Sequence, residues 1–360
     1  MGSRDPIVKW RALHVLGPVL SGRPVQLDER TWRAVGQLAL DHGLGPALWL
    51  ALGSNRPPDD VHDSLRSAYY RNLGRTMRVL ADLRAALEAL TEAGVSPVPL
   101  KGAFHLLQHT FSQPAERVLS DLDLLVPPRD VDAGVAALEA IGYQIQARNF
   151  SDTHDIPMSP AHRGVIVELH RALSGPAVTA VLPTARYLAA CRAVQWEGVS
   201  YQAARPSHVV LHNVLHAQVH DRNHYAFGIA LRQLHTFAAF VRRRGEDIDW
   251  EEVVETMEAH GALRILAGYL DLAEALFCLP PPIELQSSRL RRQACVTMAV
   301  SFGRGADVLR NVGRAFDVET LKARYGPRSR PQLWMQHGWA VWNERGIALV
   351  KEVSTSAPWR

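Results

Sequence analysis

The sequence predicts an α+β protein, in which a small core built on a mixed sheet lies between helical N-terminal and C-terminal flanks. Residues 95–173 alternate short apolar runs with helical patterns, whereas the chain on both sides is helical in its periodicity. No repeat of fixed period is visible, which argues against a solenoid. We therefore predict three regions: helical 1–94, an α/β core over 95–204 and helical 205–360.

Composition places the chain among globular proteins. Hydrophobic residues make up 47% of the sequence and charged residues 21%, enough to bury a sizeable core. No apolar run is long enough to predict a membrane span, and the first twenty residues do not resemble a signal peptide. Cys191, Cys278 and Cys295 are too widely spaced for a disulfide framework or a metal knuckle. We expect a cytoplasmic protein.

Helices are expected over 29–53 and 58–94 in the N-terminal region. The second carries apolar residues at three- and four-residue spacing. These are Leu73, Met77, Leu80, Leu83, Leu87 and Leu90. Gly94 follows as a C-terminal cap.

The core opens with a short extended segment, 95–100, whose two prolines favour a sheet edge. A helix, a strand and a second helix are expected at 103–111, 119–126 and 129–142. Three further strands follow in 143–149, 154–160 and 164–173, the last two joined by a hairpin loop. A second hairpin is expected over 193–203.

Beyond this core the sequence predicts helices throughout. They cover 205–221, 226–244, 249–260 and 261–278, and then 284–351 with one break. Residues 287–330 hold ten basic residues against three acids, although the net charge of the whole chain is only +4. This segment is either a solvated helical face or a surface for an anionic partner, such as an acidic substrate or a nucleic-acid backbone.

Two aspartates interrupt the apolar strand SDLDLLV at 120–126. Side chains alternate across a strand, so Asp121 and Asp123 point to the same face. Two neighbouring carboxylates repel each other unless a cation lies between them. Mg²⁺ or Mn²⁺, which prefer oxygen ligands, would meet this need. The alternative is a pair of acids on an exposed strand edge.

A third acid, Glu168, lies within the apolar run VIVELH. If its strand neighbours the aspartate strand, three carboxylates meet and can hold two metal ions, as in many phosphoryl-transfer sites. The alternative is an ion pair between Glu168 and Arg163 or Arg171.

The phosphate side of a nucleotide site is predicted just upstream. Lys101 and Gly102 join a strand end to a helix start, where backbone N–H groups and a basic side chain favour an anion. Arg117 can add a forked donor, and we expect Ser120 to bind the nucleotide too. The alternatives are an ordinary turn for Lys101 and Gly102, and a salt bridge of Arg117 with Glu116 or Asp121.

Four histidines, His208, His212, His216 and His220, recur every four residues and would share one helix face. Three interpretations are open: the row lines a cleft opposite the sheet, it packs in the core or on the surface, or it binds a metal. The residues between them are apolar or amides, and only Asp221 is near. We favour the cleft.

As a set, these motifs resemble the nucleotidyltransferase superfamily of the DNA polymerase β-like fold, and within it the uncharacterised nucleotidyltransferases. The resemblance covers roughly residues 40–280. The matching positions are Leu100, Lys101, Gly102, Arg117, Asp121, Asp123, Glu168 and His170.

The resemblance implies transfer of a nucleoside monophosphate from a Mg²⁺-bound nucleoside triphosphate to an unknown acceptor. By that resemblance Asp121 and Asp123 would bind both metals, and Glu168 would bind one and assist deprotonation of the acceptor. Lys101 and Gly102 would hold the triphosphate. Apart from the resemblance, we expect His170 to be a core histidine that orients Glu168 and not a catalytic residue.

Three features depart from the superfamily pattern. Ala103 follows Gly102 where the wider superfamily has serine, the third acid is Glu168 rather than aspartate, and His235 stands where an acid is expected.

Three rival functions stay open at this point. The chain could be a nucleotide-binding accessory protein without turnover, or an enzyme that uses the histidine row with zinc or iron. It could also transfer a phosphoryl group to a peptide or small molecule. P-loop and Rossmann motifs are absent from the sequence.

Overall fold

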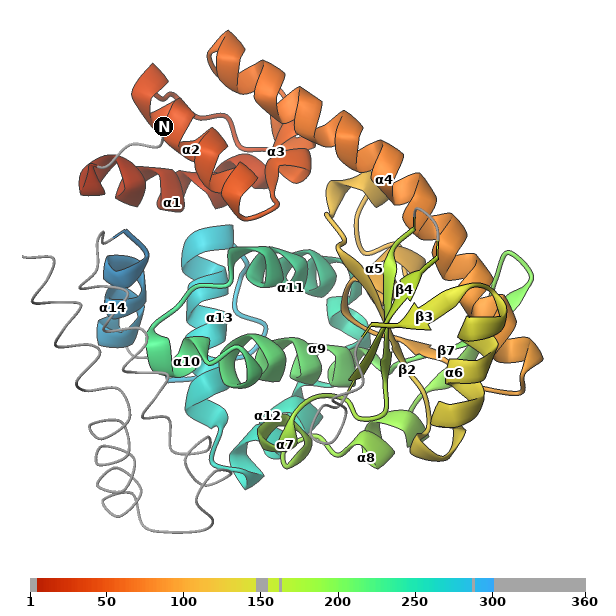
Figure 1. Ribbon diagram of the computed structural model, residues 1–360. Helices are drawn as coiled ribbons and strands as arrows, with labels where there is room; N and C mark the ends of the chain where they lie inside the picture. The colour runs from red at the N-terminus through yellow and green to blue at the C-terminus, as the bar shows by residue number, and fades with distance from the viewer. Residues whose placement is uncertain (1–4, 147–154, 162–163, 287–288, 301–360) are drawn as a thin grey trace, which may run out of the picture. The chain divides into compact units, whose positions relative to one another are not determined.

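A computed structural model of the chain describes residues 5–146, 155–161, 164–286 and 289–300. Every described residue lies in the first of the two units into which the chain divides, residues 1–302. The described part is a mixture of helices and one mixed sheet, as predicted for an α+β protein (Figure 1). The division into three regions at residues 94 and 204 stays a prediction.

Four helices form the N-terminal region: α1 (Pro6–Leu20), α2 (Glu29–Asp41), α3 (Gly45–Ala51) and α4 (Asp59–Glu92). Helix α1, which lies in the region expected to be helical but was given no bounds of its own, is capped by Asp5, whose side chain accepts the Ile7 N–H. The single helix expected over 29–53 is two helices. Gly43, with φ +68°, allows the left-handed turn between them.

Helix α4 connects the N-terminal helices to the sheet (Figure 1). Leu83, Leu87 and Leu90 are buried as the spacing predicts, but Met77 is 61% exposed. The polar residues Asn72 and Thr76 are buried in this part of α4 instead. Asn72 donates from Nδ2 to the carbonyl oxygens of residues 115 and 117, at 2.7 and 3.2 Å. Around Asn72 and Thr76, α4 therefore fixes a loop rather than filling an apolar core.

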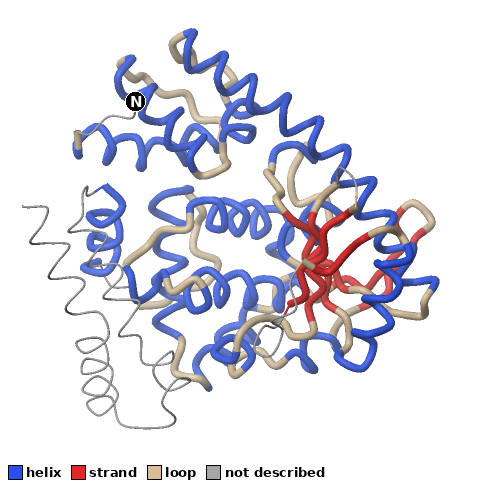
Figure 2. The backbone as a smooth tube through the Cα atoms, viewed as in Figure 1, coloured by secondary structure: helices blue, strands red, loops and turns tan. Residues whose placement is uncertain are grey.

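The sheet has five strands in the order β1-β2-β5-β4-β3. Figure 2 shows the strands in red, with helices beside them. The bounds of the strands are β1 (Val98–Pro99), β2 (Asp121–Leu125), β3 (Tyr143–Ile145), β4 (Asp155–Pro160) and β5 (Ile166–His170). β2 and β5 pair in parallel, and the other neighbours pair antiparallel. The predictions of a mixed sheet and of β1 at its edge are confirmed.

Shorter elements surround this sheet. Helix α5 (Lys101–Leu107) follows β1, the 3₁₀ turn η1 (Pro114–Glu116) precedes β2, and η2 (Pro128–Asp130) leads into α6 (Val131–Ala140). Helices α7 (Pro176–Thr179) and α8 (Thr184–Ala189) follow β5. The predicted second hairpin is β6 (Arg192–Trp196) with β7 (Val199–Ala203), which forms a separate two-stranded sheet.

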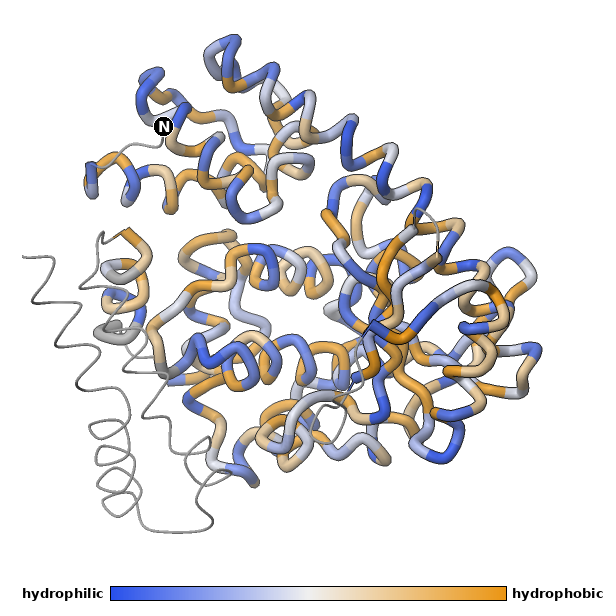
Figure 3. Tube along the Cα trace, in the orientation of Figure 1, coloured by the Kyte–Doolittle hydropathy of each residue, from blue (hydrophilic) through white to orange (hydrophobic). Residues whose placement is uncertain are grey.

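The C-terminal helices begin with α9 (Pro206–Leu215), which continues as η3 (His216–His220), a π-helical turn. They go on as α10 (Asn223–Ala226), α11 (Leu231–Arg244), the 3₁₀ turn η4 (Gly245–Asp247), α12 (Trp250–Ala259), α13 (Leu263–Phe277) and α14 (Arg289–Val300). Hydrophobic residues recur along α9, α11 and α13 (Figure 3), and most of these are buried. Most of the basic segment 287–330 lies outside the described residues; within it, Arg292 pairs with Asp271 at 2.7 Å.

Two hydrophobic cores hold these elements in place. One joins the N-terminal helices to α9, α11, α12 and α13. The other lies between the sheet, α4 and α6. Each fully buried leucine or phenylalanine contributes about 1.5–3 kcal/mol. Among the described helices, none is both long and apolar enough to span a membrane.

Candidate active site

The acidic residues lie on the two parallel strands of the sheet. Asp123 in β2 pairs with Glu168 in β5, and Asp121 pairs with Ile166. Residues directly opposite in a parallel pair share a face, and so do residues two apart in one strand. The three carboxylates therefore lie on one face of the sheet. The condition set by the sequence, that the strand of Glu168 neighbours that of Asp123, is met.

Asp123 is the most buried of the three acids, at 2% exposure. Its Oδ1 atom lies 2.5 Å from Nζ of Lys101 and 2.9 Å from Nε2 of His170. Burial alone would raise the pKa of Asp123, but the hydrogen bond from His170 and the charge of Lys101 lower it well below its usual range. Asp123 is therefore ionised at neutral pH.

Glu168 has the opposite electrostatic character. Burial, followed by the negative charges of Asp123 and Asp121, raises the pKa of Glu168 to about 7. Its Oε2 atom lies 3.7 Å from Nε2 of His170. That nitrogen is closer to Asp123, so the expectation that His170 chiefly orients Glu168 needs correcting. His170 bonds to Asp123 instead.

The charges on this face fit a divalent cation. Asp121, Asp123 and Glu168 can carry three negative charges, which Lys101 offsets by one. After burial, the charges of Asp123 and Asp121 are the next causes of the raised pKa of Glu168. Asp123, Glu168 and His170 each offer a ligand atom, and these atoms lie within 4.8 Å of one another. Oxygen-rich sites of this type suit Mg²⁺ or Mn²⁺. The sequence analysis did not anticipate that the imidazole of His170 joins this group.

Lys101 reaches Asp123 from an uncommon backbone conformation. Its φ is +43°, in the left-handed region that residues other than glycine rarely adopt. The preceding Leu100 donates its N–H to the carbonyl of Asp123 at 2.9 Å. Both the main chain and the Lys101 side chain thus connect the start of α5 to β2. Non-glycine residues in strained conformations cluster at functional sites.

Gly102 serves Arg117. A Cβ atom at Gly102 would overlap Nη1 of Arg117. Nε of Arg117 donates to Oγ1 of Thr236 in α11 at 3.3 Å. The sequence predicts that Gly102 contacts the phosphates directly and that the N-terminus of α5 binds an anion. However, α5 has only seven residues, and the bare Cα of Gly102 makes room for a guanidinium. Gly102 therefore also acts on the site indirectly, by leaving room for the Arg117 side chain.

Ser120 is exposed and lies at the entrance to β2. Its hydroxyl donates to Oδ1 of Asp121 at 3.1 Å. Arg75 in α4 donates from Nη2 to the carbonyl oxygen of Ser120 at 3.2 Å. These contacts hold Asp121 and the preceding turn together.

A cavity of about 290 Å³ lies against these residues. Six of the seven predicted site residues line it: Lys101, Gly102, Arg117, Ser120, Asp121 and Asp123. Glu168 is not part of the lining and lies beside Asp123. Side chains from α8, α9, η3 and α11 complete the lining, among them Tyr187, His212, His216, Arg232 and Gln233. The cavity therefore combines residues of the sheet with residues of the C-terminal helices.

Arg232 is a cavity residue that sequence reasoning missed. In the described part of the chain, its guanidinium makes no hydrogen bond or ion pair. Burial, and next the positive charge of Arg232, lower the pKa of Arg117 to about 10. Two guanidinium groups on one cavity repel each other unless an anion lies between them. No local motif marks Arg232, because only the packing of α11 brings it here.

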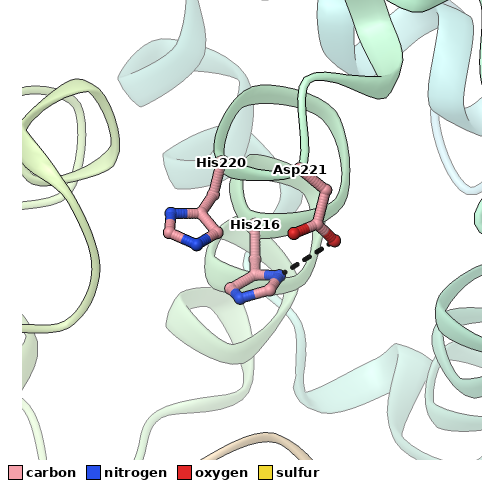
Figure 4. Close-up of side chains that lie close together, drawn as sticks. All are labelled: His216, His220 and Asp221. Carbon is pink, nitrogen blue, oxygen red and sulfur yellow. Dashed lines mark ion pairs between the residues drawn. The ribbon is translucent and has the colours of Figure 1, made fainter. Parts of the chain in front are cut away.

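The four histidines of the row have different neighbours. His212 and His216 line the cavity, as expected of a cleft-facing row. His208 bonds to Glu252 of α12 at 3.3 Å, and Nδ1 of His220 lies 3.0 Å from Oγ of Ser174. Figure 4 shows His216 beside Asp221, with Nδ1 and Oδ2 3.4 Å apart.

His235, which stands where an acid was expected, is buried away from the carboxylates. Its ring centroid lies 5.7 Å from that of Phe111 and 5.6 Å from that of Phe277. Burial, with smaller contributions from Arg242 and Arg117, lowers the pKa of His235 to about 4. It is a neutral packing residue.

One family of known proteins is similar to this chain over most of its length. A family model described as uncharacterised nucleotidyltransferase matches residues 28–278. This range includes every predicted site residue, the cavity and the histidine row. Neither the curated proteins nor the solved structures include a significant match to the chain.

Proposed function

Because this chain belongs to the family of uncharacterised nucleotidyltransferases, we propose that it transfers a nucleoside monophosphate from a nucleoside triphosphate to an acceptor hydroxyl. The observation that carries the proposal is the pairing of Asp123 with Glu168 on parallel strands, beside a cavity lined by three basic side chains. We further propose that the five-stranded sheet is a polymerase β-like core. The acidic pair on an inner strand, β2, supports this assignment.

Asp121, Asp123 and Glu168 would hold the divalent cations, Mg²⁺ or Mn²⁺. When bound in a pair, such ions neutralise phosphate charge and lower the pKa of an attacking hydroxyl. The buried, ionised Asp123 supports the assignment, because its carboxylate is held between Lys101 and His170 in a fixed orientation.

The three basic side chains of the cavity would hold the phosphates. Lys101 supplies a point charge next to Asp123, whereas Arg117 and Arg232 supply planar groups that match phosphate oxygens. A triphosphate between the two guanidinium groups would remove their repulsion. Ser120 adds a hydroxyl at the same wall.

In the proposed reaction the acceptor oxygen forms a bond to the α-phosphorus, and the bond from that phosphorus to the α,β-bridging oxygen breaks. Pyrophosphate leaves with the electron pair. Glu168 would accept the acceptor proton, because its carboxylate lies on the same face of the sheet as Asp123, next to the residues that would hold the cations. His212, His216 and Gln233 face the cavity from the helices and would contact the acceptor or the base.

Calorimetric titration with each of the four nucleoside triphosphates, with and without Mg²⁺, tests this proposal. We expect one triphosphate to bind only with Mg²⁺, and Asp123→Asn to weaken that binding at least 100-fold. Asp132→Asn is the matched control, because Asp132 is an exposed acid of α6. Mg²⁺-independent binding, or equal binding by both variants, would exclude the proposed site.

The products distinguish the rival activities. Incubation with a γ-labelled and an α-labelled triphosphate shows which group is transferred to acceptors in a cell extract. Label from the α position together with pyrophosphate release supports nucleotidyl transfer. Transfer of γ label with release of a nucleoside diphosphate would instead show phosphoryl transfer. Binding without transfer of either label would favour the accessory-protein reading.

A further inference from the structure

The chain makes an unusual turn where the histidine row ends. After α9 the backbone widens into η3, and the N–H of Asp221 donates to the carbonyl of His216 at 2.9 Å. This hydrogen bond spans five residues, where an α-helix spans four. Single π-helical turns of this kind occur frequently at functional sites.

The wide turn changes which side chains meet. In an α-helix, residues three and four apart are neighbours, so His216 and His220 would share a face while Asp221 would lie off it. Here the extra residue in the turn brings Asp221 next to His216. Figure 4 shows the carboxylate and the His216 ring turned toward each other, with the His220 ring alongside. The centroids of the two rings are 4.7 Å apart.

The distances in this cluster fit one metal ion. Each of the three residues offers a ligand atom, and the three atoms lie within 4.8 Å of one another. Two atoms bound at about 2.1 Å and at a tetrahedral angle lie about 3.4 Å apart. The separation of His216 Nδ1 and Asp221 Oδ2 is 3.4 Å. A ligand atom of His220 completes the set within 4.8 Å of the other two ligand atoms.

Neighbouring polar groups orient these side chains. Nε2 of Gln233 lies 2.9 Å from Oδ2 of Asp221 and 3.1 Å from Nδ1 of His216. Oγ of Ser174 lies 3.0 Å from Nδ1 of His220. The contact of Ser174 at Nδ1 of His220 would orient that ring to bind a metal through Nε2. The Gln233 amide contacts the two atoms of His216 and Asp221 that would bind the metal, so it has to swing aside when the ion enters. The turn itself is closed by Asn223, whose Nδ2 donates to the carbonyl of Ala217 at 2.7 Å.

We propose that His216, His220 and Asp221 form a binding site for a divalent transition-metal ion, with Zn²⁺ as the expected occupant. Two imidazoles and one carboxylate are a ligand set that zinc accepts with one position left open. His216 and Asp221 line the cavity, so a ligand in the cavity can reach that position. The site differs in chemistry from the carboxylates of β2 and β5, which suit Mg²⁺. It does not depend on the proposed transferase activity.

The test is a zinc titration of the full-length chain without a histidine tag. Excess Mg²⁺ is present throughout, so that it occupies the carboxylates of β2 and β5. We expect one Zn²⁺ per chain by calorimetry, and at least 100-fold weaker binding by the double variant His216→Ala/His220→Ala. Asp221→Asn should weaken binding about tenfold. Co²⁺ should give the intense visible absorption of a four-coordinate site in the wild type.

Two controls separate this site from other metal binding. The double variant His109→Ala/His260→Ala removes two exposed histidines elsewhere and should keep full zinc affinity. Asp123→Asn should also keep it. Circular dichroism establishes that each variant is folded. The proposal is overturned if folded wild type binds no zinc, if zinc binding survives in the His216/His220 variant, or if it disappears in Asp123→Asn.

Discussion

Lys101 and Asp123 form an ion pair with Nζ and Oδ1 2.5 Å apart, and Lys101 makes it from a left-handed backbone conformation with φ +43°. Burial works to lower the pKa of Lys101, but the carboxylates of Asp123, Glu168 and Asp121 outweigh it and raise the pKa. The charge of Lys101 in turn helps to keep Asp123 ionised. Asp123 is therefore kept ionised in part by a side chain whose own backbone is held in a strained conformation.

The strain at Lys101 can be measured with two substitutions. Lys101→Ala and Lys101→Gly both remove the ammonium group, but only glycine adopts a positive φ without steric cost. We expect the glycine variant to be more stable than the alanine variant by about 1 kcal/mol. Urea unfolding of both variants provides the comparison. Equal stabilities, or a more stable alanine variant, would mean that the left-handed conformation at this position is not strained.

Gly102 and Arg117 should behave as one unit in nucleotide binding. Gly102→Ala places a methyl group where the Arg117 guanidinium lies. It should therefore weaken triphosphate binding by about tenfold, or roughly 1.4 kcal/mol, and Arg117→Ala should weaken it to the same extent. Once Arg117 is already alanine, adding Gly102→Ala should cost little more. A double-mutant cycle measures this coupling. Additive losses would show that Gly102 acts independently of Arg117, for example through its backbone.

Arg232→Gln should change stability and binding in opposite directions. The substitution removes a positive charge that lowers the pKa of Arg117, so the protein without nucleotide should become slightly more stable. Triphosphate binding should weaken about tenfold, because one of two guanidinium groups facing the anion is lost. Thermal unfolding and calorimetry give the two quantities. Arg129→Gln, at an 85% exposed position, should change neither. Unchanged affinity in Arg232→Gln would remove Arg232 from the phosphate site.

The sequence predicts the acidic strands well because their signal is local. A charged residue within an apolar run marks both Asp123 and Glu168, and alternation along β2 places Asp121 with Asp123. Their pairing also depends on the direction and register of the two strands, which the structure supplies.

What the sequence does not reveal depends on contacts between distant segments or on irregular backbone. The charge of Arg232 matters only because α11 packs beside the sheet. The four-residue spacing of His216 and His220 reads as an α-helix, so the π-helical turn that brings Asp221 to them leaves no mark in the periodicity. Met77 fits the apolar spacing of α4 but is exposed, because the loop that packs there requires the amide of Asn72.

His235 should make the stability of the protein fall as the pH decreases below neutrality. Its pKa is about 4 when folded, chiefly because of burial, against about 6.5 in the unfolded chain. Between these values the unfolded state binds more protons than the folded state, so protons favour unfolding, by about 3 kcal/mol at pH 4. His235→Phe keeps a ring between Phe111 and Phe277 and removes this titration. Urea unfolding at pH 7.5, 6.0 and 5.0 measures this loss. As the pH falls, the free energy of unfolding should decrease less in His235→Phe than in the wild type. The control His260→Gln, at an exposed position, should follow the wild type. Identical losses in wild type and His235→Phe would show that His235 is protonated in the folded protein and not buried as a neutral ring.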